Sequence, residues 1–313
     1  TGAGTITLNG TGGLSTGTTN VGVMIANGAT GSVTANGGAI TINGTGGLGS
    51  NNANIGIYVG GTTVGSVTNT GTGTITLNGT GGGSASSFYN YGTYVNSGAI
   101  VSTVNGALSV TGIGGNGAGT GGFNFGVYVN QASSTIKSTG TGTVTVNGTG
   151  SNSSAGANVG VNIIAGSIAG AGGAVSISGN GGVNAGSAND GVRVNAGTIS
   201  NTGTGTVTVN GTGGGAGASN SNYGVWVVYA GVISSVNGAV NVTGVGGAGT
   251  AGTNHGVFIR EISSAIKSTG AGSITVTGTK GAGSSTGIYT TGVVNAVQTT
   301  GAGNITLLTD TIS

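Results

Sequence analysis

The sequence predicts an all-β protein, a right-handed parallel β-helix (β-solenoid) with three short strands in each coil. Three observations lead to this prediction. A short apolar triplet returns about every 33 residues along the 313-residue chain. Each triplet is followed by a second alternating strand and by a third, shorter one. The intervening stretches are rich in glycine, with 77 glycines and no proline in the chain. The period therefore predicts nine to ten coils of about 33 residues.

The first strand of each coil is the apolar–polar–apolar triplet. Strand alternation puts Ile6 and Leu8 on one face and Thr5 and Thr7 on the other, so the aliphatic side chains face the core. Successive triplets begin 31 to 36 residues apart. They lie at 6–8, 40–42, 75–77, 108–110, 144–146, 175–177, 207–209, 240–242, 274–276 and 305–307.

An Asn-Gly pair after the first strand is interpreted as a corner. Asparagine and glycine both accept the positive φ that tight corners require. The equivalent asparagines are Asn9, Asn43, Asn78, Asn147 and Asn210, and Ser178 and Thr243 replace them in other coils. A longer, variable loop follows, as at 14–20 and 84–90.

The second strand begins at a glycine and then alternates, as in Gly56-Ile57-Tyr58-Val59. The third strand has one aliphatic residue before small polar residues. These aliphatic residues are Ile100, Ile136, Ile168, Ile199, Ile233, Ile266 and Val297. Coils stacked at the strand spacing would bury the aliphatic residues as ladders. A proline would remove a hydrogen-bond donor from such a ladder, which explains its absence.

The handedness prediction comes from the connections. Crossovers between parallel strands prefer the right-handed path, which favours a right-handed helix. A β-sandwich or barrel array is the alternative. It is disfavoured because no Asn-Gly pair separates two strands at hairpin spacing.

Residues 1–313 are predicted to form one solenoid domain. Within it, a four-coil block near 68–199 is repeated near 200–313. TNTGTGTITLNGTGGG at 68–83 becomes SNTGTGTVTVNGTGGG at 200–215. Duplicated blocks are how long rods grow, so we expect this chain to be a fragment of a longer rod. Neither end has an obvious cap, which predicts end-to-end self-association or a longer parent chain.

The composition argues against several classes of function. A net charge of +2 with five Lys and Arg provides no basic stripe for nucleic acid. No run of 18 apolar residues predicts a membrane-spanning helix. The three acids, Asp190, Glu261 and Asp310, fall in different coils, whereas glycosidase or lyase chemistry needs clustered carboxylates. With His255 as the single histidine, we expect no enzyme, no metal site and no cofactor.

One row of the second strand is unusually aromatic. If the residues on either side point inward, this row points outward. Its members are Met24, Tyr58, Tyr94, Tyr128, Asn162, Arg193, Trp226, Phe258 and Tyr289. Exposed aromatic rings would be a binding surface for carbohydrate or for a neighbouring rod. Alternatively, the variable loop folds over the row and makes it a secondary core.

A second row is rich in threonine on the outer face of the first strand. It contains Thr5, Thr7, Thr74, Thr76, Thr143, Thr145, Thr206 and Thr208. A flat Thr-x-Thr array resembles ice-binding solenoids. Ala39, Ala107, Ala174 and Ala239 interrupt it in alternate coils, and threonine is also a common residue on a solvated strand.

The NGTGG phrases, the GVYV-type strands and the tail GAGNITLLTDTIS at 301–313 resemble bacterial surface adhesin repeats. The chain is similar to filamentous-haemagglutinin-like exoproteins and to their autotransporter relatives. The resemblance implies a secreted, extracellular protein of the bacterial cell surface, with a role in adhesion, aggregation or biofilm. It also implies a host or neighbouring-cell surface as partner.

Three functional hypotheses follow. The first is a structural, adhesive extracellular rod that binds through its loops and the aromatic row. The second is an ice-binding solenoid that uses the threonine face. The third is a filament subunit that stacks on itself and binds no receptor.

Overall fold

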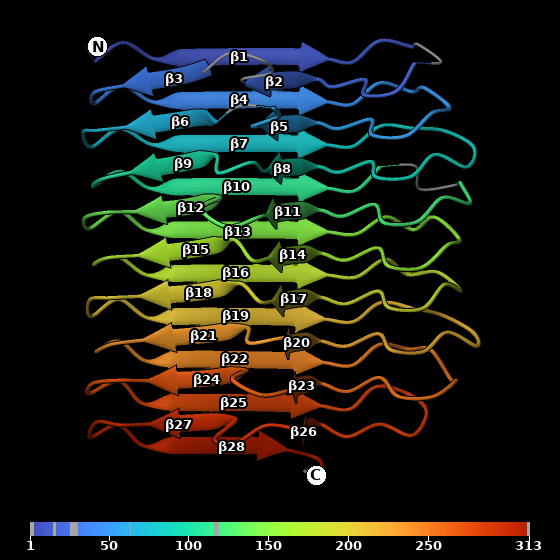
Figure 1. Ribbon diagram of the computed structural model, residues 1–313, viewed down its shortest axis with the longest axis vertical. Coiled ribbons are helices and arrows are strands. Elements are labelled where there is room, and N and C mark those ends of the chain that lie inside the picture. The colour runs from blue at the N-terminus through green and yellow to red at the C-terminus, as the bar shows by residue number, and fades with distance from the viewer. Residues whose placement is uncertain (1–2, 15–16, 26–30, 63, 116–118, 312–313) are drawn as a thin grey trace.

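The protein is a parallel β-solenoid (Figure 1). The computed structural model describes residues 3–14, 17–25, 31–62, 64–115 and 119–311. Within them, strands β1 to β28 form three sheets of ten, nine and nine strands, and no helix occurs. The chain visits the three sheets in turn, about 33 residues per coil. The predicted fold class is confirmed. Ile312 and Ser313, which close the adhesin-like tail, lie outside the described residues.

The three sheets are called A, B and C. Sheet A contains β1 (Ile6–Thr11), β4 (Ile40–Thr45), β7 (Ile75–Thr80), β10 (Leu108–Ile113), β13 (Val144–Thr149), β16 (Val175–Asn180), β19 (Val207–Thr212), β22 (Val240–Val245), β25 (Ile274–Thr279) and β28 (Ile305–Thr309). Sheet B contains β2 (Val23–Ile25), β5 (Ile57–Val59), β8 (Thr93–Val95), β11 (Val127–Asn130), β14 (Val161–Ile164), β17 (Val192–Asn195), β20 (Val225–Val228), β23 (Val257–Arg260) and β26 (Ile288–Thr291). Sheet C contains β3 (Gly31–Ala35), β6 (Gly65–Asn69), β9 (Ile100–Thr103), β12 (Thr135–Ser138), β15 (Ser167–Gly170), β18 (Thr198–Asn201), β21 (Val232–Ser235), β24 (Ala265–Ser268) and β27 (Val297–Thr299).

Equivalent residues of successive coils lie directly over one another. Ile40 pairs with Ile75, and Ile75 pairs with Leu108, in parallel register. In the strands between the two ends of the solenoid, alternate residues are buried, so aliphatic side chains from all three sheets fill one continuous core. Ile75 of sheet A, Val95 of sheet B and Val101 of sheet C are examples, each fully buried. The predicted inward face of the first strand is therefore correct.

The hydrogen bonds fix the handedness. Inward-facing residues donate their N–H to the following coil in every sheet: Ile6 to Ala39, Val23 to Gly56 and Ile266 to Ala296. In an L-residue, the side-chain direction follows from the chain direction and the N–H direction together. Side chains that point inward while the N–H points to the following coil require the chain to turn in a right-handed sense. The solenoid is right-handed, as the sequence predicts.

The predicted corner at the Asn-Gly pair is wrong. Strand β7 runs through Asn78 and Gly79 to Thr80, and none of Asn9, Asn43, Asn78, Asn147 and Asn210 has a positive φ. The glycine serves a different purpose, because it faces inward where sheets A and B approach closely. A Cβ on Gly79 would overlap the carbonyl oxygen of Gly92. Glycine is required there because it lacks a side chain.

The actual corner lies before sheet B and carries a buried asparagine ladder. The backbone N–H of Asn90 donates to Oδ1 of Asn124 at 2.9 Å, and Asn124 does the same to Asn158 at 3.0 Å. The full series is Asn54, Asn90, Asn124, Asn158, Asn189, Asn222 and Asn254, ending on the hydroxyl of Ser285. In most coils the residue directly before the ladder asparagine has a positive φ, as Ala53 (64°) and Ala188 (64°) do.

One prediction for the third strand is shifted by a residue. The register pairs Ile136 with Val101, and Ile100 with Thr135. Val101 is buried and Ile100 is partly exposed, so Val101 is the core residue of that coil. Ile100 and Val101 are both apolar, so the sequence alone could not show which of them faces the core, and the prediction of Ile100 was wrong. The other predicted residues of this strand, from Ile136 to Ile266, are fully buried.

The inward glycines provide a test of the close contact between sheets A and B. A Cβ on Gly148 would overlap the Gly160 carbonyl oxygen, which is backbone and has little room to move. We expect Gly148→Ala to lower the free energy of unfolding by about 1–3 kcal/mol. Gly13→Ala is the matched control, because a methyl group on Gly13 would meet no atom within 4 Å beyond its chain neighbours. The measurement is the urea midpoint by circular dichroism, and equal midpoints for the two variants would contradict this packing.

Candidate functional site

The outer row of sheet B has the register that the sequence predicts. Tyr58 pairs with Tyr94, Tyr94 pairs with Tyr128, and Trp226 pairs with Phe258. The complete outer row is Met24, Tyr58, Tyr94, Tyr128, Asn162, Arg193, Trp226, Phe258 and Tyr289. One side chain per coil therefore projects from the same line on the outside of the solenoid.

A second row, called the covering row here, packs against the outer row. It comes from the turn before sheet B, where eight coils have the pattern Asn-x-Gly and the ninth has Ser285-Thr286-Gly287, x being the covering residue. Its members are Val21, Ile55, Tyr91, Phe125, Val159, Asp190, Tyr223, His255 and Thr286. The asparagine ladder holds this turn against sheet B. The covering row was not predicted from the sequence, although the recurring Asn-x-Gly pattern was a signal that could have revealed it.

The outer row is partly covered. It is neither the fully exposed binding surface nor the fully buried secondary core that the sequence left as alternatives. Phe258 is 6% exposed and Asn162 is 1% exposed. The seven other members keep part of their surface in solvent: Met24, Tyr58, Tyr94, Tyr128, Arg193, Trp226 and Tyr289. The covering row thus forms a small second core while part of each of these seven side chains stays in solvent.

The aromatic residues form two clusters. In the first, Tyr58, Tyr94 and Tyr128 are stacked, with ring centroids 4.8 and 4.9 Å apart. Tyr91 of the covering row lies against Tyr128 at 5.1 Å, and Phe125 lies stacked on Tyr91 at 5.3 Å. These spacings match favourable aromatic packing.

The second cluster lies near the C-terminal end. Trp226 and Phe258 are parallel, with centroids 6.2 Å apart, and Phe258 lies 5.3 Å from Tyr289. From the covering row, His255 stacks on Tyr223 at 5.6 Å and on Tyr289 at 4.5 Å. A histidine thus replaces one ring of an otherwise aromatic stack.

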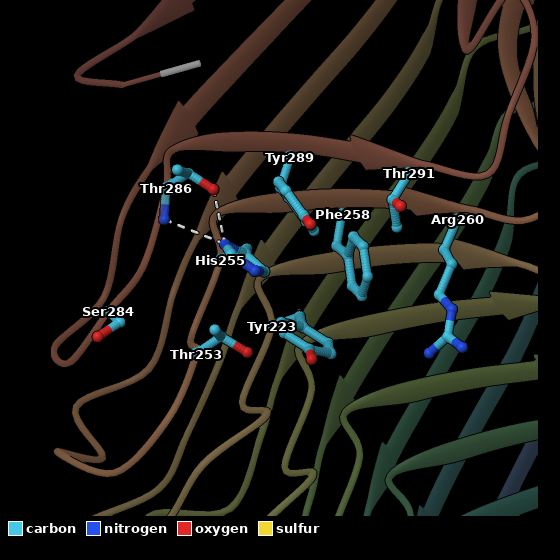
Figure 2. A pocket seen from close by; sticks show the side chains of 9 residues that line it. All are labelled: Tyr223, Thr253, His255, Phe258, Arg260, Ser284, Thr286, Tyr289 and Thr291. Carbon is cyan, nitrogen blue, oxygen red and sulfur yellow. Dashed lines mark hydrogen bonds between the residues drawn. The ribbon is translucent and has the colours of Figure 1, made fainter. Parts of the chain in front are cut away.

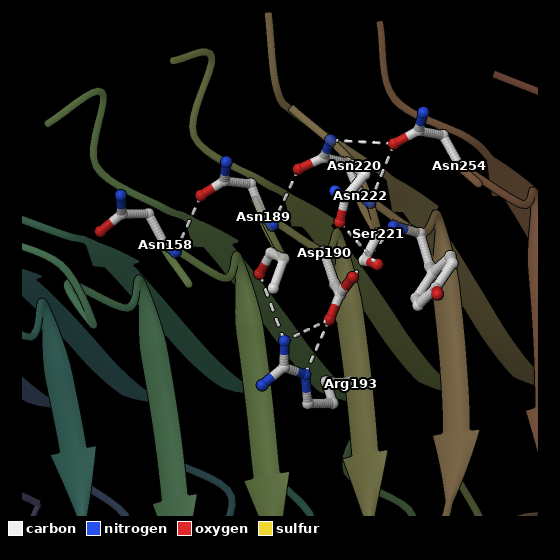
Figure 3. A network of polar contacts seen from close by, with 10 residues as sticks. Asn158, Asn189, Asp190, Arg193, Asn220, Ser221, Asn222 and Asn254 are labelled. Atoms are coloured by element: carbon white, nitrogen blue, oxygen red, sulfur yellow. Dashed lines mark hydrogen bonds and ion pairs between the residues drawn. The ribbon is translucent and has the colours of Figure 1, made fainter. Parts of the chain in front are cut away.

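A buried ion pair separates the two clusters (Figure 3). Arg193 Nη2 lies 2.6 Å from Asp190 Oδ2, and Nε lies 2.7 Å from the same oxygen. The other carboxylate oxygen accepts the Tyr223 N–H at 2.9 Å. The guanidinium also lies over the Trp226 ring, 4.8 Å from its centroid. Burial raises the pKa of Asp190 above its ordinary value, while Arg193 and the Tyr223 N–H oppose that shift.

The second cluster forms one wall of an open groove of about 530 Å³ (Figure 2). Its lining includes Tyr223, His255, Phe258, Arg260 and Tyr289. The hydroxyl side chains of Thr253, Ser284, Thr286 and Thr291 complete it. In Figure 2, the Phe258 and Tyr289 rings stand between His255 at one end and Arg260 at the other. Aromatic walls with a few polar groups are typical of small-ligand sites.

The hydrogen bonds of His255 assign its tautomer. Nδ1 accepts the backbone N–H of Thr286 at 3.0 Å, and it lies 2.7 Å from the Thr286 hydroxyl. A backbone N–H can only donate, so Nδ1 carries no proton and the neutral ring has its proton on Nε2. Burial lowers the pKa of His255, which favours this neutral form. The ring is therefore a neutral hydrogen-bond donor through Nε2.

The other charged residues from the sequence analysis lie apart. Glu261 contacts Arg260 Nε at 3.3 Å, and Asp310 accepts the Lys280 N–H at 3.1 Å. Asp190 is held by Arg193. Across the part of the chain that the structure describes, no group of three His, Asp or Glu side chains is placed to hold a metal ion.

The threonine face lies on the outside of sheet A. Its middle line continues from Thr76 through Ser109 to Thr145, so small hydroxyl residues stack between coils. Asn241 interrupts this line opposite Thr208. Thr5, Thr7, Thr74, Thr143 and Thr206 are exposed, and Thr76, Thr145 and Thr208 are partly exposed.

Comparison with protein-family models, with curated proteins and with solved structures finds no match to this chain. Over the described residues, no helix is long and apolar enough to cross a membrane.

The buried ion pair predicts a pH-dependent stability defect. Arg193→Met leaves the Asp190 carboxylate buried without its partner, which we expect to cost about 3–5 kcal/mol at neutral pH. A raised carboxyl pKa means that the native state binds the proton more tightly than the unfolded chain does. The defect should therefore shrink as the pH falls and Asp190 becomes neutral.

Thermal unfolding at neutral and acidic pH measures this defect. Arg260→Met is the matched control, because the Arg260 side chain is 49% exposed and its pairing with Glu261 should contribute little. An Arg193→Met defect that does not change with pH would show that the carboxylate is not the source.

The first aromatic cluster predicts a loss of stability in alkali. Burial raises the pKa of Tyr94 from 10.0 to about 12, and burial also raises the pKa of Tyr91 and Tyr128. The native state thus favours the protonated phenols. Their contribution to stability is complete below about pH 10 and is lost as the pH rises to about 12 and above.

Tyrosinate absorbance and far-ultraviolet circular dichroism, followed together from pH 8 upward, test this prediction. Tyr94→Phe keeps the ring and removes one phenol, so it should unfold at higher pH than the wild type. A variant that unfolds at the same pH would mean that Tyr94 does not contribute to the alkaline transition.

Proposed function

We propose that this chain is a structural, adhesive rod of a bacterial surface or secreted fibre protein, and that it binds saccharide through the outer row. The observation that carries the proposal is the ladder of partly exposed rings, Tyr58, Tyr94 and Tyr128, stacked at 4.8 and 4.9 Å. Because Tyr58 and Tyr128 cover the two faces of Tyr94, a sugar ring would contact the exposed parts of the stacked rings by dispersion, and the tyrosine hydroxyls would supply polar contacts.

The rod geometry supports a multivalent role. Every coil presents one outer-row side chain, and the backbone hydrogen bonds to its neighbours keep the rows rigid. Two separate clusters on one rigid face could engage the same polymer at two places. Linking two weak sites in this way raises the overall affinity without any new contact.

The cellular setting rests on the resemblance of the NGTGG and GNITL phrases to bacterial adhesin repeats. Extracellular location, adhesion and a cell-surface partner are thus parts of the proposal. Self-association is a further part, and β28 supports it. Its Ile305, Leu307 and Leu308 are 41%, 40% and 52% exposed, which is the surface that another coil would cover.

The test is binding to a panel of immobilised neutral and acidic polysaccharides. We expect the triple variant Tyr58→Ala, Tyr94→Ala, Tyr128→Ala to bind at least about tenfold more weakly than the wild type, since each ring contact contributes roughly 0.5–1.5 kcal/mol. The control is Thr76→Ala, Thr145→Ala, Thr208→Ala on sheet A. Circular dichroism checks that both variants keep the β-solenoid. No binding of the wild type to any polysaccharide would contradict the proposal, as would equal binding of the wild type and the tyrosine variant.

Ice binding is the second candidate, supported by the outer face of sheet A. The line through Thr7, Thr41 and Thr76 repeats one hydroxyl per coil on a regular parallel sheet. Ser109 and Asn241 interrupt the threonines, which is why we favour the adhesive rod. Thermal hysteresis of the wild type, lost in the threonine variant, would favour ice binding instead. Filaments in electron micrographs without polysaccharide binding would favour the self-stacking alternative.

A further inference from the structure

The groove differs from its counterpart in the first block at several lining positions, among them Thr253, Thr286, Tyr289 and Thr291, which replace Phe123, Val159, Asn162 and Ile164. Two further differences give the groove its histidine and its arginine. His255 corresponds to Phe125 and Arg260 corresponds to Asn130, each 130 residues earlier. Phe125 is buried among aromatic rings, and Asn130 donates to the Tyr94 hydroxyl at 3.3 Å. Both blocks build the same coil, so neither the histidine nor the arginine is required for folding.

The rings of the groove form an extended apolar surface. Tyr223 and Tyr289 flank Phe258, with centroids 4.9 and 5.3 Å from it. Phe258 is buried at the base, and Tyr289 keeps part of its ring in solvent. A flat or chair-shaped ligand ring can therefore pack on the exposed part of Tyr289 without displacing Phe258.

Two side chains of the groove supply nitrogen donors, the neutral His255 and the positively charged Arg260. His255 presents its Nε2 proton, since Nδ1 is occupied by Thr286. The Arg260 side chain is 49% exposed, and its contact with Glu261 uses Nε, which leaves the terminal Nη groups for a ligand. None of the nine lining residues is acidic. A guanidinium binds a carboxylate with two parallel hydrogen bonds.

We propose that the groove binds an acidic saccharide, with a hexuronic acid ring packed on Tyr289 and its carboxylate on Arg260. His255 Nε2 donates to a ring or hydroxyl oxygen of the same sugar at the opposite end of the groove. This inference rests on the proposed saccharide-binding function and specifies the charge of the ligand. The first block, with Phe125 and Asn130 in these places, has no such selectivity.

The experiment is isothermal titration of the whole chain with trigalacturonate and with its methyl ester. The two probes share every ring and differ in the carboxylate charge. We expect the free acid to bind at least about tenfold more tightly than the ester, which is the size of one charge-assisted hydrogen bond. Added salt should lower the affinity for the acid, because it screens the carboxylate from Arg260, and should leave the affinity for the ester unchanged.

Two variants each return one groove residue to that of the first block. Arg260→Asn should reduce the preference for the acid to less than about twofold and leave ester binding unchanged. His255→Phe should weaken acid and ester alike, because it removes a donor to uncharged oxygens. Both substitutions place residues that the first block already accommodates, so we expect the fold to be kept, and circular dichroism checks this.

Equal binding of acid and ester, or an acid preference that survives Arg260→Asn, would overturn the inference. Failure of both probes to bind would overturn it as well. Neither result decides the proposed function, which stands or falls with the polysaccharide panel and the tyrosine variant of the first cluster.

Discussion

Every coil of this protein is hydrogen-bonded to the coil before it and the coil after it, and this constraint determines the rest of the structure. Inward residues donate forward along the axis, as Ile40 does to Thr74, and their outward neighbours bond backward, as Thr135 does to Ala99. A coil that changed its path would leave buried N–H and C=O groups unpaired on two neighbours. Equivalent positions must therefore have the same backbone shape, and side chains stack in rows as a consequence.

The same constraint explains the glycines and the buried asparagines. Sheets A and B approach closely, so the inward position of Gly148 against Gly160 admits no Cβ. The corner before sheet B has no neighbouring strand to bond, and the Asn90 side chain takes that role. Its Oδ1 accepts the Asn54 N–H, while its Nδ2 donates to the Ser87 carbonyl at 3.1 Å within the turn. Because the corner is fixed in this way, the covering row is held over sheet B and shapes the candidate site.

The sequence was sufficient for the parts that repeat with simple periods. Alternation identified the buried Ile75 and Leu77, the outward Thr76 and the position of Tyr94. It failed where one residue type has two uses. Asn78-Gly79 is a common turn pair, but here the glycine relieves a clash and the strand continues through it. The covering row was missed because Tyr91 and His255 sit in a turn, where the Asn-x-Gly pattern recurs but no strand alternation assigns the middle residue to a face. Their role depends on contacts with the next element, which a local pattern does not contain.

The outer row is the part of the coil that the axial hydrogen bonds do not constrain. The residue at this one position of sheet B is methionine, tyrosine, asparagine, arginine, tryptophan or phenylalanine, and the strand keeps the same register with its neighbours in each case. Some of these choices are unfavourable for stability. The buried Asn162 amide and the Trp226 Nε1 have no hydrogen-bond partner among the described residues, and an unpaired buried group costs about 1–3 kcal/mol. Ring stacking and packing against the covering row account for part of the aromatic content of this row, and the proposed ligand-binding surface would account for the ring area that stays in solvent. The two blocks strengthen this argument, because the fold stays the same while Phe125 and Asn130 become His255 and Arg260.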